Sequence, residues 1–123
     1  MLRIVIATTR PKALQAFRAA LASDSEVHLK HAVSGAEALE ATRTDAPQLV
    51  IIDADLPDTP PFDLVQKLLM VNAMVNTAVL SPLADEDFHE VSEGLGILSR
   101  LPKEPGESDA AELLCKLRKI LVI

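Results

Sequence analysis

Aromatic residues and cysteine are scarce in this chain of 123 residues. It contains three Phe, no Tyr and no Trp, so it lacks the aromatic platforms on which proteins stack unpaired bases. Its single cysteine, Cys115, cannot form an internal disulfide, which is typical of proteins in a reducing compartment. We therefore expect a cytoplasmic protein in which Cys115 is a packing residue.

Positive charge is also in short supply. Twelve basic residues face eighteen acidic ones, for a formal net charge of -6, and such a surface repels phosphate backbones and anionic lipids. No stretch approaches the roughly 20 apolar residues of a membrane span, and the apolar run within residues 1–7 is too short for a signal peptide. The sequence predicts a protein that binds neither nucleic acid nor membranes.

The chain is otherwise ordinary, being 49% hydrophobic and 24% charged, and its length suits one compact domain over residues 1–123. Short β-branched apolar runs alternate with segments of helical spacing, a pattern typical of an α/β fold. Strands are predicted at 4–7, 27–33, 49–53, 77–81 and 97–101. Helices are predicted at 11–22, from the Ser34 to Glu37 capping box to before Pro47, and at 62–71, 85–93 and 108–120.

The run of apolar residues over 49–52 indicates a central strand, because such a strand needs cover on both faces. Five βα units with right-handed crossovers then predict one doubly wound, five-stranded parallel sheet flanked by five helices, as in flavodoxin-like folds. In such folds the ligand crevice lies at the carboxyl ends of the strands. Five polar residues lie at or just beyond these predicted ends: Thr8, Thr9, Asp53, Ser81 and Lys103.

The order and spacing of these residues resemble the receiver domain of bacterial two-component response regulators over essentially the whole chain. The strongest stretch is PQLVIIDADLP at residues 47–57. The resemblance implies a signalling module, not an enzyme, in which Asp53 accepts a phosphoryl group from a histidine kinase, Ser81 contacts that group and Lys103 binds it. A carboxylate at a strand tip is a reasonable nucleophile, and a lysine ammonium can neutralise phosphoryl oxygens.

The sequence also departs from the family pattern. The acidic pair that holds magnesium in the family falls on Thr8 and Thr9, whereas magnesium is normally captured through one or two carboxylates and waters. If magnesium binds, Asp53 and Asp55 are the predicted ligands and hold it weakly; no other cofactor is expected.

Further positions differ as well: the family's aromatic switch position is Arg100, Glu104 separates Lys103 from the next proline, and Pro61 and Pro82 stand where the family usually has a Gly and a small residue. These departures predict an atypical receiver that acts through protein contacts with weak or no phosphorylation.

Two hypotheses concern the loops at this edge. A carboxylate that ends a buried strand costs desolvation energy unless it is paired, so we expect Asp53 and Lys103 to form a standing ion pair. Thr8 and Thr9 are expected to cap the helix that begins at Pro11.

Three alternatives stay open. The first is a conventional phosphorylatable receiver that binds magnesium through substitute acids, for which Asp55, Asp58, Asp85, Glu86 and Asp87 are available. The second is a small-ligand-binding protein of the same fold, and the third is an assembly module. The expected partners are a histidine kinase or another signalling protein. A homodimer face formed by residues 85–93, 97–101 and 108–120 is a further hypothesis.

Overall fold

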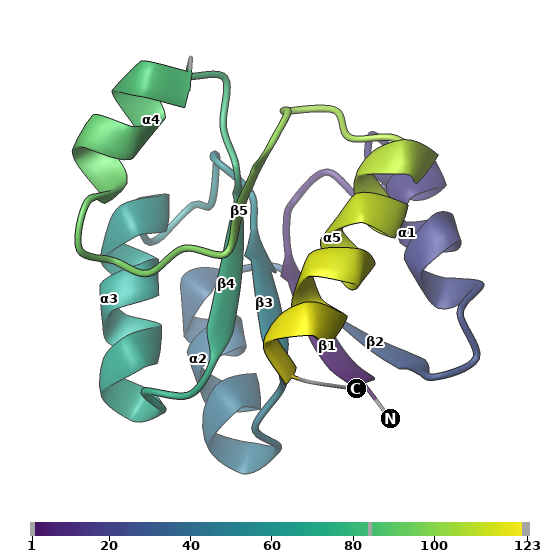
Figure 1. Ribbon diagram of the computed structural model, residues 1–123. Helices are drawn as coiled ribbons and strands as arrows, with labels where there is room; N and C mark the ends of the chain where they lie inside the picture. Colours follow the sequence, from purple (N-terminus) through teal and green to yellow (C-terminus); the bar gives the residue numbers. More distant parts are fainter. Residues whose placement is uncertain (1, 84, 122–123) are drawn as a thin grey trace.

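The protein is described here by a computed structural model that covers residues 2–83 and 85–121 (Figure 1). Within these ranges strands and helices alternate along the chain. Their bounds are β1 Leu2–Ala7, α1 Gln15–Ala22, β2 Val27–Ala32, α2 Gly35–Thr44, β3 Leu49–Ile52, α3 Pro61–Val71, β4 Asn76–Leu80, α4 Asp85–Ser92, β5 Ser99–Leu101 and α5 Glu107–Leu121. The five strands of these ranges pair in parallel in the order β2-β1-β3-β4-β5. The predicted doubly wound α/β fold is confirmed.

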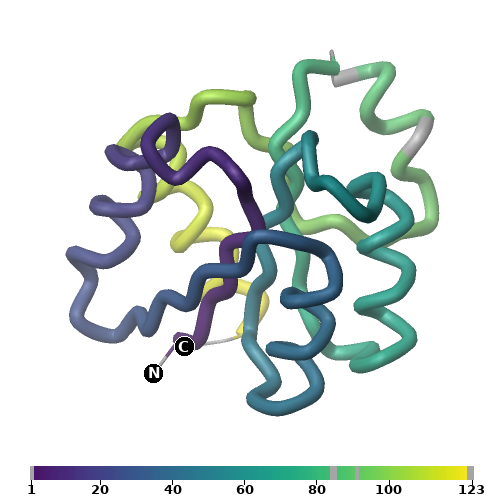
Figure 2. Tube along the Cα trace, turned by 180° about the vertical axis from the view of Figure 1, so that it is seen from behind, coloured from purple at the N-terminus to yellow at the C-terminus, as the bar shows by residue number. Residues whose placement is uncertain are grey.

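Helices cover both faces of the sheet (Figures 1 and 2). One hydrophobic cluster joins the sheet to α1 and α5, and a second joins it to α2, α3 and Phe88 of α4. The central strand β3 contributes to both, since Leu49 and Ile51 belong to the first cluster and Val50 and Ile52 to the second. All four side chains are fully buried, as the uninterrupted apolar run predicts.

The predicted capping box at the start of α2 is formed with one difference, because the Glu37 side chain bonds to Val33 and not to the N-cap residue Ser34. The hydroxyl of Ser34 accepts a hydrogen bond from the backbone N–H of Glu37 at 3.1 Å, and the Glu37 carboxylate accepts one from the N–H of Val33 at 3.2 Å. Two backbone donors of the helix start are thereby satisfied. Because Val33 bonds to the helix side chain, it lies outside β2, which ends one residue earlier than predicted.

Helix α1 differs more from the prediction. It begins at Gln15, after a turn over residues 11–14, and Leu14 at its start makes no side-chain cap. The prediction that Thr8 and Thr9 cap this helix is therefore wrong. Strand β5 also starts later than predicted, because Gly94 and Gly96 adopt φ angles of 83° and 63° and prolong the turn that precedes it.

Cys115 lies on an exposed side of α5, so its predicted role in packing is wrong. No helix among the described residues is both long enough and apolar enough to cross a membrane.

Candidate functional site

The strands of the sheet point their carboxyl ends to one edge, where the loops that follow them gather (Figures 1 and 2). The backbone pairing continues one residue past the strands. The N–H of Asp53 donates to the carbonyl of Ala7, and that of Ser81 to the carbonyl of Leu101, each at 2.9 Å. Asp53 and Ser81 are thereby fixed at the edge as the first residues beyond β3 and β4.

Asp53 is the buried carboxylate of this edge, with 1% of its surface exposed. Its Oδ2 accepts from the Thr8 hydroxyl at 2.6 Å and from Nε of Arg10 at 2.9 Å. Its Oδ1 accepts from the N–H of Ala54 at 2.7 Å and from Nη2 of Arg10 at 2.9 Å. A carboxylate offers about four acceptor positions, so these donors use its full capacity.

Arg10 itself is held in place from both ends. Its backbone N–H donates to the Thr8 hydroxyl at 2.9 Å, and its Nη2 also donates to the backbone carbonyl of Lys103 at 2.9 Å. The planar guanidinium makes the two-pronged contact that arginine forms best with carboxylates. Arg10 thus ties together the loops after β1, β3 and β5.

The charges of this pair stabilise one another. Burial alone raises the pKa of Asp53, but the hydrogen bonds from Arg10, Thr8 and the Ala54 N–H outweigh it, and the pKa lies below its usual value. The hydrogen bond to Asp53 in turn raises the pKa of Arg10. Asp53 therefore carries its negative charge at neutral pH despite its burial.

The predicted ion pair between Asp53 and Lys103 is wrong. The Lys103 side chain is exposed, and its Nζ lies 3.6 Å from the carboxylate of Asp55, which is exposed as well. The cation that sequence reasoning missed is Arg10, which the chain places directly after the two threonines. The sequence held a signal for this contact. Arg10 has a long basic side chain and follows the first strand closely, so it could have been expected to reach the carboxylate at the end of the neighbouring central strand.

The other predicted residues have local roles. The buried Ser81 accepts a hydrogen bond from the Leu83 N–H at 3.2 Å, which shapes the turn after β4. Thr9 is exposed. Asp58 accepts from the N–H groups of Gly35 and Ala36 at 2.8 and 3.0 Å. These two bonds lower the pKa of Asp58 and cap α2.

These residues do not fit a magnesium ion. Of the two predicted ligands, Asp53 has its acceptor positions filled by protein donors, and Asp55 pairs with Lys103. Among residues 2–83 and 85–121, no three His, Cys, Asp or Glu side chains are grouped as metal ligands. Of the substitute acids, Glu86 and Asp87 are exposed on α4, and the side chain of Asp85 lies outside the described part. The guanidinium of Arg10 supplies the positive charge at Asp53 instead.

Comparison of the sequence with protein-family models and with curated proteins finds no match. The fold, in contrast, matches many solved structures. A CheY-like receiver domain protein from Methanospirillum hungatei JF-1 is 19% identical with a TM-score of 0.83, over 97% of this chain and 95% of that one. Chemotaxis response regulator CheY4 of Vibrio cholerae is 17% identical with a TM-score of 0.82, over 95% and 98%.

A third similar structure is the N-terminal domain of the uncharacterized protein WS1339 from Wolinella succinogenes. It is 20% identical with a TM-score of 0.83, over 99% of this chain and 98% of that domain. The chain therefore has the fold of response regulator receiver domains, as the sequence resemblance implies.

Proposed function

We propose that residues 1–123 act as an atypical receiver-like signalling module that works through protein contacts without phosphorylation of Asp53. The observation that carries the proposal is the two-pronged contact of Arg10 with the Asp53 carboxylate. Receiver domains are signalling modules and generally not enzymes, so the fold supports a signalling role. Asp53 then occupies the phosphoacceptor position as a structural anion, held by an arginine in place of a metal ion.

The chemistry of phosphoryl transfer supports this reading. An attacking carboxylate must direct a free lone pair at the phosphorus, and a cation must bridge the phosphoryl oxygens as charge develops. In this protein hydrogen bonds occupy both oxygens of Asp53, and its lowered pKa marks a weaker nucleophile. The Arg10 side chain would have to move away before a phosphoryl donor could reach Asp53. The buried negative charge of Asp53 would then lack its partner, which is energetically costly.

The proposal also concerns the cellular compartment and the partners of the module. We propose a cytoplasmic protein whose partner is a histidine kinase or another signalling protein, recognised by the surface and not by a phosphoryl group. A homodimer through the face formed by α4, β5 and α5 stays a prediction from the sequence, and it is an alternative to the association between copies that is proposed below. Ser81 and Lys103 keep their predicted positions after β4 and β5, but their contacts with a phosphoryl group stay predictions.

Acetyl phosphate tests the proposal. The protein is incubated with acetyl phosphate and magnesium and its intact mass is measured, with D53N treated in parallel. We expect no gain of about 80 Da, the mass of one phosphoryl group, in either protein. Stoichiometric modification of the natural protein that is lost in D53N would contradict the proposal and favour a conventional receiver.

A repaired variant shows whether Arg10 and the missing acids are the cause. In T8D/T9D/R10A the acidic pair of the family is restored and the guanidinium is removed. We expect this variant, once circular dichroism has confirmed its fold, to gain the adduct in a magnesium-dependent way. T8D/T9D retains Arg10 and is the matched control, which we expect to remain unmodified.

A further inference from the structure

Charge is distributed unevenly between the two ends of the sheet. Helix α4, at the β5 end, carries Glu86 and Glu90, and Glu93 lies in the turn that follows the helix; all three side chains are exposed. The spacing of four residues places Glu86 and Glu90 along one face of the helix. We call these three residues the acidic stripe. Like-charged neighbours repel one another, so the stripe is a surface that favours a cationic partner.

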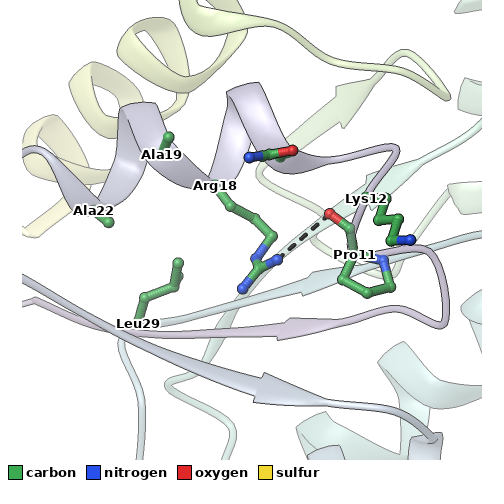
Figure 3. Close-up of a pocket in the computed structure, with 7 residues that line it drawn as sticks. Pro11, Lys12, Arg18, Ala19, Ala22 and Leu29 are labelled. Atoms are coloured by element: carbon green, nitrogen blue, oxygen red, sulfur yellow. Dashed lines mark hydrogen bonds between the residues drawn. The ribbon is translucent and has the colours of Figure 1, made fainter.

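A hollow of about 480 Å³ lies between α1 and β2, at the other end of the sheet (Figure 3). Small and apolar side chains, Ala19, Ala22 and Leu29, line one part of it, and Lys12 and Arg18 line the other. We call this hollow the basic groove. Its described lining residues include no Asp or Glu. The Arg18 guanidinium donates to the Pro11 carbonyl at 3.4 Å, which holds it beside the groove.

The acidic stripe and the basic groove cannot meet within one molecule. Strands β2 and β5 are the two edges of the sheet, and Figure 1 shows α4 and α1 on opposite sides of the molecule. One copy therefore presents an acidic surface on one side and a basic surface on the other. The complementary surfaces can come together only between two copies.

We propose that this protein associates head to tail, with the acidic stripe of one copy docked in the basic groove of the next. The contact is between two different surfaces, so each complex leaves one stripe and one groove free for further copies. The contact between the stripe and the groove depends on exposed charges, which interact weakly and are screened by salt. The association is therefore weak, concentration-dependent and lost at high ionic strength.

A second set of cations could compete for the stripe. Lys116 and Lys119 lie exposed on α5, within the homodimer face predicted from the sequence. Acidic side chains share that helix, since Glu107, Asp109 and Glu112 precede the lysines, and Lys116 donates to the Ser99 hydroxyl at 3.3 Å. The basic groove combines a hollow with charge of one sign among its described lining residues, so it is the better match for a row of carboxylates.

Sedimentation velocity with charge-reversed variants tests the proposal. At about 0.1–1 mM protein and low salt we expect the natural protein to show a mass-average roughly twofold above the monomer. In about 1 M salt, where screening acts over roughly 3 Å, we expect the monomer mass. K12E/R18E and E86K/E90K are each expected to remain monomeric in low salt, whereas a mixture of the two associates, because each supplies the surface that the other needs.

Two comparisons distinguish the specific contact from a general effect of net charge on association. K116E/K119E changes the net charge as much as K12E/R18E does, and we expect it to associate like the natural protein. E86K/E90K brings the net charge nearer to zero, so general repulsion alone would make it associate more, not less. Thermal unfolding of each variant verifies its fold. A natural protein that stays monomeric in low salt overturns the proposal, as does loss of association in K116E/K119E or a mixture that fails to recover it.

Discussion

The guanidinium of Arg10 contacts both carboxylate oxygens of Asp53 through two hydrogen bonds of 2.9 Å each. Asp53 is almost fully buried and the Arg10 side chain is 23% exposed, so the pair lies at the boundary between the core and the loops. A buried charge of this kind depends on its partner, because removing one member leaves the other without compensation. The stability of the edge of the sheet is therefore expected to depend on Arg10.

Replacement of Arg10 tests this dependence. We expect R10A to lower the free energy of unfolding by about 3–5 kcal/mol, the range seen when a buried ion pair loses one partner. Urea denaturation measures the change. R43A is the matched control, because Arg43 pairs with Glu40 at 3.6 Å on an exposed part of α2, and we expect a change within about 0.5 kcal/mol. Equal losses in the two variants would contradict the assigned role of Arg10.

The lowered pKa of Asp53 predicts how stability depends on pH. The unfolded chain protonates this carboxyl near its ordinary pKa of about 3.9, whereas the folded protein holds it ionised to lower pH. The unfolded state thus binds more protons in this range, and stability falls as the pH falls. We expect D53N to show a shallower loss of unfolding free energy between about pH 5 and pH 2 than the natural protein, measured by urea denaturation at each pH. Identical slopes would show that Asp53 is not stabilised as an anion.

Gly35 permits a close approach of the loop after β3 to the start of α2. A Cβ atom at this position would lie 2.7 Å from Oγ1 and 3.0 Å from Cβ of Thr59, closer than ordinary contacts allow. We expect G35A to lower the free energy of unfolding by about 1–3 kcal/mol, typical of overpacking. G106A is its control, since a Cβ at Gly106 meets no atom within 4 Å. A G35A protein as stable as G106A would contradict this close packing.

Asp58 is expected to stabilise α2 from outside the helix. Its carboxylate accepts from two backbone N–H groups of the first turn, and loss of such a cap costs about 0.5–2 kcal/mol. We expect D58A to lower the melting temperature measurably. D55A is the comparison, because the exposed pair of Asp55 with Lys103 contributes little. If D55A lowered the melting temperature more than D58A does, the role of Asp58 as the cap of α2 would be contradicted.

Much of the fold could be predicted from local patterns, and the site only in part. The apolar run of β3 and the capping box of α2 are short-range signals that the packing reinforces. Thr8 and Asp53 could be placed at one edge because the carboxyl ends of parallel strands meet there. The cation that pairs with Asp53 could not be predicted from the sequence. Whether Arg10 or Lys103 reaches the carboxylate depends on how two loops orient these long, flexible side chains. The turn over residues 11–14, which moves the start of α1, is part of that loop geometry.

A magnesium titration followed by NMR tests the central claim most directly. The backbone N–H of Ala54 donates to Asp53, so its amide resonance reports on a cation at that carboxylate. If the Arg10 guanidinium takes the place of a metal ion, the Ala54 and Thr8 resonances stay unchanged up to about 10 mM magnesium, well above the Kd of a millimolar site. A saturable shift of these resonances within this range of magnesium concentration would contradict the account.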